Sequence, residues 1–167
     1  MMQNNDIIRI MDITFSSSVD GTGFRDVLFV NFCPHRCEGC HNRETWDKEN
    51  GKDVSVDYCF ERLTESSITN VTFSGGEPFC QAGALYSLGK RLIEAGKDIW
   101  IYSGYTFEEI IKDEEKKKLL SICKVLVDGR FILAEKGLNM RFKGSANQRI
   151  IDVQKSLEKG EVVLADV

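Results

Sequence analysis

Apolar residues along the chain fall into short runs that indicate buried β-strands. The clearest runs are rich in Val, Ile and aromatic side chains, and they have the length expected of strands covered on both faces. They occupy residues 27–32, 70–73, 98–102 and 124–128, and a weaker run lies at 149–153. An alternating run at 7–15 predicts a further strand near the N-terminus.

Helical patterns lie between these runs. Apolar residues at helical spacing predict a helix that ends near residue 95, with Gly96 as its C-terminal cap. Thr106 and Glu109 have the spacing of a capping box at the start of another helix, which continues into the charged run at 112–118. The alternating signs of that run indicate a solvated face rather than a docking surface. A third helix is expected at 56–66.

Strands that alternate with helices predict an α/β architecture with parallel strands. We expect about five to six β/α units, fewer than the eight of a complete barrel, which typically needs about 250 residues. A chain of 167 residues therefore fits a partial, open TIM-like barrel or a wound sheet. Nothing in the composition divides it, so we expect a single domain over residues 1–167.

The overall composition indicates a cytoplasmic protein. A net charge of −4 predicts no general attraction to nucleic acid or to an anionic membrane. The chain contains no apolar run near the roughly 18 residues that span a bilayer, and its first residues lack the features of a secretory signal. In the cytoplasm, six cysteines indicate metal binding, redox chemistry or buried thiols rather than a disulfide framework.

Three of the cysteines, Cys33, Cys37 and Cys40, follow the first buried strand in the segment FCPHRCEGCHN. The carboxyl ends of parallel strands form the edge at which active sites of α/β folds assemble. Three thiolates can bind three corners of a cubane iron–sulfur cluster and leave the fourth iron open to a substrate. This spacing therefore predicts a catalytic metal centre with these cysteines as ligands.

Two closed metal sites are alternatives. Zinc can be bound by the same three cysteines together with His35 or His41. A fourth cysteine, Cys59, Cys80 or Cys123, can instead complete a closed electron-transfer cluster. These three are more typical of small core residues, although Cys80 lies just after a second loop that borders the predicted site.

That second loop, TFSGGEPF at 72–79, also follows a strand and is expected at the same edge of the sheet. Gly75 and Gly76 allow the backbone to approach a ligand closely, and Glu77 supplies a carboxylate. Taken alone, the segment is equally consistent with a simple turn. Beside the three-cysteine segment it supports a binding site.

The motif Cys-x3-Cys-x2-Cys followed by Gly-Gly-Glu-Pro resembles the radical S-adenosylmethionine superfamily. Residues 19–42 resemble the glycyl-radical activating enzymes, and in particular the small branch that activates anaerobic ribonucleotide reductases. Gly39 is typical of that branch, whereas most of the superfamily has an aromatic residue there. Phe79 and Cys80 depart from its pattern, which more often has an aliphatic residue before the glutamine. The supporting segments lie at 103–105, 126–131 and 142–153.

The resemblance implies two cofactors and a set of contacts for each. A [4Fe-4S] cluster is expected on Cys33, Cys37 and Cys40, with S-adenosylmethionine chelated at its open iron. The ammonium group of S-adenosylmethionine is expected on the backbone and carboxylate of Gly75, Gly76 and Glu77. Other residues expected to contact S-adenosylmethionine are Gly39, Cys40, His41, Ser103 and Asp128.

The implied reaction is the reductive cleavage of S-adenosylmethionine to methionine and a 5′-deoxyadenosyl radical. That radical takes a hydrogen atom from a glycine of the protein substrate, the large subunit of an anaerobic ribonucleotide reductase. Reduced flavodoxin or ferredoxin is the implied electron donor. The basic segment 141–149 is expected to receive the glycine loop, and Asp20, Gly21 and Arg25 to shape the same opening.

Three other functions remain open at this point. They are activation of a different glycyl-radical enzyme, radical chemistry on a small molecule, and a non-catalytic zinc or electron-transfer module.

Overall fold

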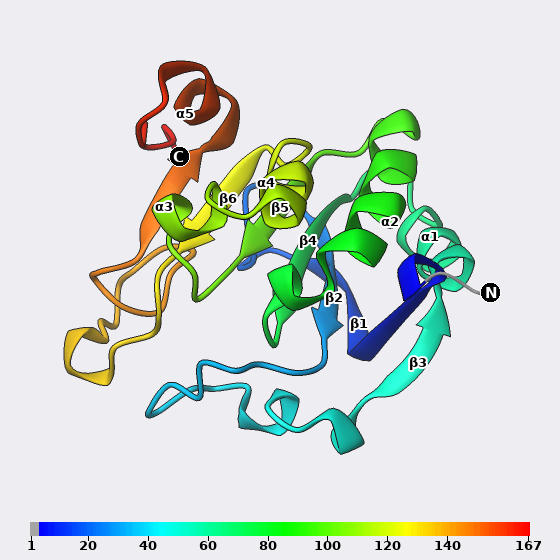
Figure 1. The fold of residues 1–167 in the computed structure, drawn as a ribbon, viewed down its shortest axis with the longest axis horizontal. Coiled ribbons are helices and arrows are strands. Elements are labelled where there is room, and N and C mark those ends of the chain that lie inside the picture. Colours follow the sequence, from blue (N-terminus) through cyan, green and yellow to red (C-terminus); the bar gives the residue numbers. More distant parts are fainter. Residues whose placement is uncertain (1–3) are drawn as a thin grey trace.

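A single mixed sheet of seven strands organises the protein in a computed structural model that describes residues 4–167 (Figure 1). Its order is β3 (Lys52–Ser55), β1 (Ile7–Ser17), β2 (Arg25–Val30), β4 (Asn70–Gly75), β5 (Ile99–Tyr102), β6 (Val125–Asp128) and β7 (Arg149–Asp152). Strands β2, β4, β5 and β6 are parallel, whereas β1, β3 and β7 pair antiparallel with their neighbours. The carboxyl ends of the four central strands therefore meet at one edge.

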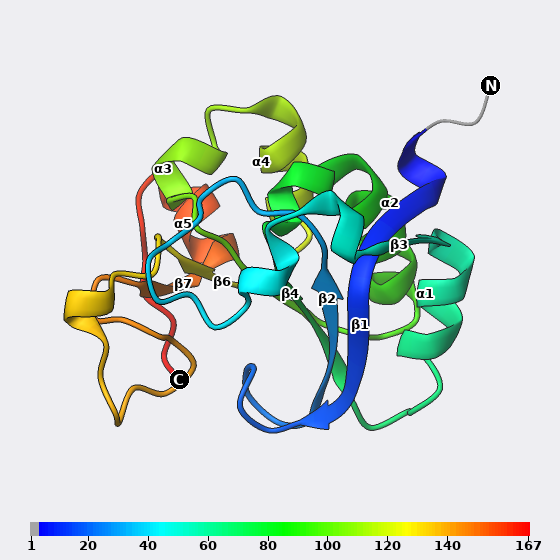
Figure 2. The same ribbon diagram turned by 90° about the horizontal axis from the view of Figure 1, so that it is seen from below.

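Helices cover one face of this sheet. The helices are α1 (Val56–Leu63), α2 (Ala82–Glu94), α3 (Phe107–Ile110), α4 (Glu114–Leu120) and α5 (Val153–Lys159). Helix α2 packs between α1 and α4 over the central strands, while α5 lies beyond β7 near the C-terminus (Figures 1 and 2). Short 3-10 helices lie in the connections, as η1 (Asn4–Asp6), η2 (Arg43–Thr45), η3 (Lys48–Asn50), η4 (Pro78–Gln81) and η5 (Leu133–Glu135). No helix in the described range 4–167 is long and apolar enough to cross a membrane.

Alternation along the strands produces two cores. Ile99 and Ile101 point into the large core beneath the helices, whereas Trp100 between them belongs to a smaller cluster on the opposite face. Phe142 closes that smaller cluster by packing edge-on against the Trp100 ring at a centroid distance of 5.2 Å. The sheet thus has a helix-covered face and a second face that is only partly covered.

The predicted strands are confirmed in position, and their directions give one correction. The strands predicted at 7–15 and 149–153 correspond to β1 and β7, which run antiparallel to the neighbours that lie toward the sheet centre. The parallel part therefore has four strands, fewer than the five to six β/α units expected. An apolar run indicates that a strand is buried, but a buried strand can run in either direction, so the pattern does not predict whether it is parallel or antiparallel.

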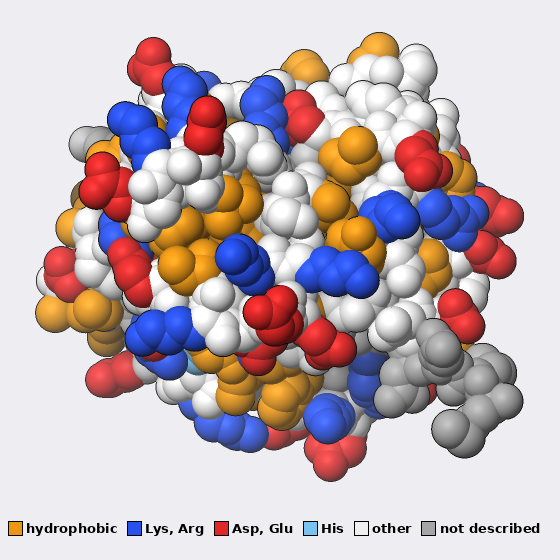
Figure 3. All heavy atoms as spheres, turned by 45° about the horizontal axis from the view of Figure 1, so that its top comes forward, with side chains coloured by type: hydrophobic (Ala, Val, Ile, Leu, Met, Phe, Trp, Pro, Cys, Tyr) orange, Lys and Arg blue, Asp and Glu red, His pale blue; other side chains and the backbone are white. Residues whose placement is uncertain are grey.

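The capping predictions are confirmed at single-residue level. The Thr106 hydroxyl accepts from Glu109 N at 3.2 Å, and the Glu109 carboxylate accepts from Thr106 N at 3.0 Å. Gly96 takes a left-handed φ of 89° just after α2. The charged run at 112–118 is largely exposed, as expected, and acidic and basic side chains are interspersed over the face in Figure 3.

The helix predicted through that charged run is wrong in one respect, because the structure divides it into α3 and α4. Asp113 has an extended backbone, and its carboxylate accepts a hydrogen bond from Lys116 N at 3.0 Å. It therefore starts a new helix by N-capping it.

Candidate active site

The cysteine segment is a tightly turned loop that begins directly after β2. Residues 31–42 contain no helix or strand, and Phe32, Arg36 and Gly39 have φ values of 78°, 50° and 77°. Within it, Cys40 N donates to Cys37 O at 3.1 Å. The loop lies at the carboxyl edge of the parallel strands, as the sequence predicts.

All three cysteines of this loop are free and half-buried. Burial raises the pKa of the Cys33 thiol to about 11, and the nearby Glu77 carboxylate acts in the same direction. A coordinating metal ion displaces the proton of a thiol, so metal binding at this loop would release protons. In the described part of the chain, no three His, Cys, Asp or Glu side chains are gathered closely enough to hold a single metal ion.

The donor set fits a cluster held by three cysteines. Cys59 and Cys123 are completely buried in the core beneath the helices, so they are core residues and not a fourth ligand. Cys80 is exposed and lines a different cavity. The two histidines of the zinc alternative have other partners than the three thiols. His35 contacts Glu77, and the centroid of the His41 ring lies 5.9 Å from that of the Phe131 ring.

The Gly-Gly-Glu-Pro loop lies directly against the cysteine loop. Gly76 N donates to Val30 O and Glu77 N donates to Phe32 O, each at 2.8 Å. An added Cβ would lie 2.6 Å from Val30 N at Gly75 and 2.2 Å from Phe32 O at Gly76. The two glycines are therefore required for a close backbone approach, but the partner in this structure is the end of β2 for Gly75 and the start of the cysteine loop for Gly76, rather than a ligand.

Glu77 is completely buried, and the chain itself fills its hydrogen-bonding capacity. Its carboxylate accepts from His35 Nε2 at 2.7 Å, Ser103 Oγ at 2.9 Å, Gly104 N at 2.8 Å and Phe79 N at 3.0 Å. A carboxylate offers about four acceptor positions. An ammonium group can therefore bind this carboxylate only by displacing one of these donors.

Asp128 lies in a separate buried cluster. It is 1% exposed and accepts from Phe107 N at 2.7 Å and from Arg149 at 2.6 and 3.0 Å. Arg149 also pairs with Glu108 at 2.7 Å, and these carboxylates raise the pKa of its guanidinium. Asp128 thus joins β6, β7 and α3, and its contact with a cofactor stays a prediction.

A cavity of about 440 Å³ opens beside Cys40 on the partly covered face. We call it the Cys40 cavity. Its lining comes from the β1–β2 connection at 18–20, the cysteine loop at 40–42, the ends of β4 and β5, and the segment 140–144 with Gln148. The structure therefore brings Cys40, His41, Asp20 and part of the predicted basic segment around one space.

Two of the expected contributors to that opening lie elsewhere. Arg25 is the first residue of β2, so it lies at the strand end opposite the cysteine loop, where it is buried and donates to Thr72 Oγ1 at 2.9 Å. An added Cβ at Gly21 would lie 2.5 Å from the Arg25 side chain. Both residues lie near Trp100, and neither lines the Cys40 cavity.

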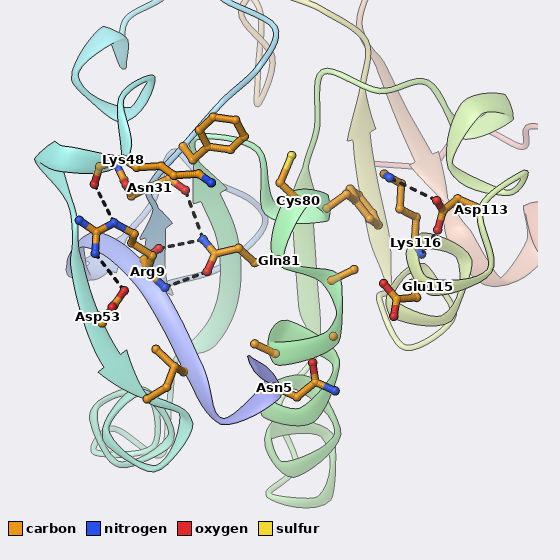
Figure 4. Close-up of a pocket in the computed structure, with 16 residues that line it drawn as sticks. Asn5, Arg9, Asn31, Lys48, Asp53, Cys80, Gln81, Asp113, Glu115 and Lys116 are labelled. Atoms are coloured by element: carbon orange, nitrogen blue, oxygen red, sulfur yellow. Dashed lines mark hydrogen bonds and ion pairs between the residues drawn. The ribbon is translucent and has the colours of Figure 1, made fainter. Parts of the chain in front are cut away.

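A larger cavity of about 760 Å³, the Cys80 cavity, lies on the other side of the cysteine loop. Figure 4 shows Arg9 of β1 beside Gln81 of η4 in its lining: the Arg9 backbone N donates to Gln81 Oε1 at 2.8 Å, whereas the Arg9 guanidinium points toward Asp53 and Lys48. The Gln81 amide also donates to Asn31 O at 3.2 Å. None of the three cysteines of the loop lines this cavity.

The sequence does not predict the role of His35. Because this residue lies between two predicted ligands, its position indicates only a possible zinc ligand. Its true partner, Glu77, is 42 residues away in the chain. The pairing is visible only once β2 and β4 are placed side by side.

Comparison with known proteins supports one family. The family model described as "4Fe-4S single cluster domain" matches residues 19–151. Three relatives named anaerobic ribonucleoside-triphosphate reductase-activating protein come from bacteriophage T4, Vibrio cholerae and Escherichia coli K12. They are 37%, 35% and 32% identical to this chain, over 78–79% of it and 86–90% of their own length.

Solved structures that are similar in fold include a relative of low sequence identity. The crystal structure of QueE from Escherichia coli matches with a TM-score of 0.52 and 19% identity. The match covers 60% of this chain and 54% of QueE. It supports the α/β fold described above.

Proposed function

The chain belongs to the family of anaerobic ribonucleoside-triphosphate reductase-activating proteins, and on that premise we propose that it generates a glycyl radical on the large subunit of an anaerobic ribonucleotide reductase. It is a radical S-adenosylmethionine enzyme, an oxidoreductase that uses a [4Fe-4S] cluster and S-adenosylmethionine. Cys33, Cys37 and Cys40 would hold the cluster, which when bound would supply the one-electron reduction that cleaves S-adenosylmethionine and so allows a hydrogen atom to be removed from the glycine.

The arrangement of the cysteine loop carries this proposal. Cys33, Cys37 and Cys40 are the cluster ligands, and they lie on one turned loop at the carboxyl edge of the sheet. Cys40 and His41 line the Cys40 cavity, so a substrate that entered this cavity would lie beside a cluster held by the three thiols. The chain's part in the reaction is to hold the thiols, to orient the reactants and to limit the access of water.

The remaining site residues take two roles in this proposal. Gly39, Cys40, His41 and the backbone of Gly75–Glu77 contact S-adenosylmethionine, because they adjoin the cluster ligands. Ser103 and Asp128 act indirectly, since one donates to Glu77 and the other binds Arg149. The carboxylate of Glu77 is assigned to the chain rather than to the cofactor, because its acceptor positions are filled.

The partner's glycine loop enters the Cys40 cavity past the segment 140–144. Arg141 and Lys143 line this opening, whereas Arg149 is held in ion pairs with Asp128 and Glu108.

Reduced flavodoxin or ferredoxin supplies the electron, and the protein acts in the cytoplasm without a nucleic-acid or membrane partner. The seven-stranded sheet is the wall of a partial, open TIM-like barrel within one radical S-adenosylmethionine domain.

Electron paramagnetic resonance of the anaerobically reconstituted protein tests the proposal. The spectrum of the reduced cluster should change when S-adenosylmethionine is added. Addition of an anaerobic ribonucleotide reductase should then produce a glycyl radical on the large subunit of that reductase. A cluster spectrum indifferent to S-adenosylmethionine would contradict the open iron, and cofactor cleavage without a radical on the reductase would point to a small-molecule substrate.

A further inference from the structure

His35 makes a buried contact that the proposed reaction does not itself require. It lies on the cysteine loop between Cys33 and Cys37, yet its side chain is only 4% exposed. Its Nε2 atom lies 2.7 Å from Glu77 Oε1. Because the carboxylate accepts in this contact, Nε2 carries the hydrogen.

The end of β5 is shaped around the His35 ring. An added Cβ at Gly104 would lie 2.4 Å from His35 Cδ2, so the ring occupies the space of a missing side chain. Tyr105 packs against the same ring edge-on, at a centroid distance of 4.5 Å. Ser103 and Gly104 N donate to the carboxylate that His35 contacts. One imidazole therefore connects the loop after β2 with the loops after β4 and β5.

Few other contacts hold this part of the cysteine loop. Between Cys33 and Cys40, two side chains of the described structure bond to other segments, namely His35 to Glu77 and Arg36 to Asp47. The Arg36–Asp47 pair is exposed on both sides, and exposed pairs contribute little. The buried pair contributes more, because a buried carboxylate that loses a donor is costly.

We propose that His35 is a positioning residue that fixes the cysteine loop, and with it the three cluster-binding thiols, against the Glu77 carboxylate. This role rests on the proposed function only for its consequence at the cluster. The anchoring itself is a property of the chain and is present without metal. Glu77 is then the common attachment point of three strand ends.

Hydrogen exchange of the metal-free protein tests the anchoring directly. In His35→Ala, the hydrogen-bonded amides at 33–42, such as Cys40 N, should exchange at least about tenfold faster, because a hydrogen bond to a charged group is lost. His35→Gln should restore most of the protection, since its amide can donate from the same position. Gly104→Ala should resemble His35→Ala, because the added methyl displaces the ring.

Glu38→Gln is the matched control on the same loop. Glu38 is exposed and has no hydrogen-bond or ion-pair partner in the described structure, so exchange should match the parent. Protection of α2 should be the same in every variant, which shows that the fold is intact. Unchanged exchange at 33–42 in His35→Ala would overturn the proposal.

A second measurement follows the consequence at the cluster. After reconstitution, His35→Ala should give a reduced-cluster resonance spread over several species, whereas His35→Gln should give one species like the parent. A parent-like spectrum in His35→Ala would overturn the positioning role. If the parent itself bound no cluster, the proposed function would fail, while the exchange result would still decide whether His35 anchors the loop.

Discussion

At the scale of single residues, Gly76 decides how closely the loops of the site approach each other. Gly76 faces the backbone oxygen of Phe32, which cannot move without shifting the cysteine loop. Gly83 in α2 provides a comparison, because an added Cβ there would also meet an atom at 2.2 Å. That atom, however, is the side-chain oxygen of exposed Asn5, which can rotate away.

Gly76→Ala should therefore lower the free energy of unfolding by about 1–3 kcal/mol, the usual cost of overpacking. Gly83→Ala should be neutral or slightly stabilising, since alanine favours a helix by up to about 1 kcal/mol over glycine. Urea denaturation of the two metal-free variants measures both values. Equal stability of the two would show that the loops do not need their close approach.

Substitutions of Cys37 and Cys59 should have opposite effects on iron binding and on stability, because Cys37 lies in the site and Cys59 lies in the core. Cys37→Ala should abolish iron binding and cofactor cleavage, yet change the free energy of unfolding by less than about 0.5 kcal/mol, because Cys37 lies half-exposed on a loop. Cys59→Ala should retain the cluster and lose about 1 kcal/mol of stability, because it removes a buried sulfur. Iron analysis and thermal unfolding separate the two effects. Cleavage retained in Cys37→Ala would refute its assignment as a ligand.

At the scale of elements, the Arg149 ion pairs join β7 to β6 and α3. Arg149→Met should cost about 3 kcal/mol, because it leaves Asp128 buried without its main partner. Glu108→Gln should cost less than about 1 kcal/mol, because that pair is largely exposed. Urea denaturation at neutral pH measures the difference. Equal losses would mean that burial of Asp128 does not matter.

The Glu108 pair also predicts a pH dependence. The hydrogen bond from Arg149 lowers the pKa of Glu108 in the folded protein. Its contribution is therefore fully present above the ordinary glutamate pKa of about 4.3 and is lost as the pH falls through the lowered value. The stability difference between the parent and Glu108→Gln should shrink over that acidic range. A difference that grows on acidification would contradict this assignment.

Elements differ in how well the sequence predicts them, and the reason is burial. Strands β2, β4, β5 and β6 are recognisable because most of their residues are buried. Strand β3 has only one half-buried residue and, among residues 4–167, pairs with β1 alone, so it carries no apolar run. Helix α5 is also missed, because its seven residues are mostly polar.

The site shows the same limit. The cysteine spacing and the Gly-Gly-Glu-Pro segment are local patterns, and they predict two adjacent loops correctly. The partners of Glu77 and Asp128 come from other strands, so sequence alone cannot show that these carboxylates are already bonded within the chain.

At the scale of the whole molecule, all seven strands belong to one sheet, and one large core runs beneath the helices. The metal-free protein should therefore unfold in a single cooperative transition. Trp100 reports on the sheet, and Trp46→Phe removes the other tryptophan. Urea midpoints from Trp100 fluorescence and from far-ultraviolet circular dichroism should coincide. Separate midpoints would indicate more than one domain.

The C-terminal tail covers one edge of the sheet, and this should limit self-association of the protein at high concentration. Asp152 N donates to Val163 O at 2.8 Å and Ala165 N donates to Ile150 O at 2.9 Å, so the tail occupies the outer side of β7. At the other border of the sheet, β3 is only four residues long. Exposed strand edges are templates for aggregation. A chain shortened after Gly160 should therefore self-associate, and light scattering of the full and shortened proteins at equal concentration would reveal it.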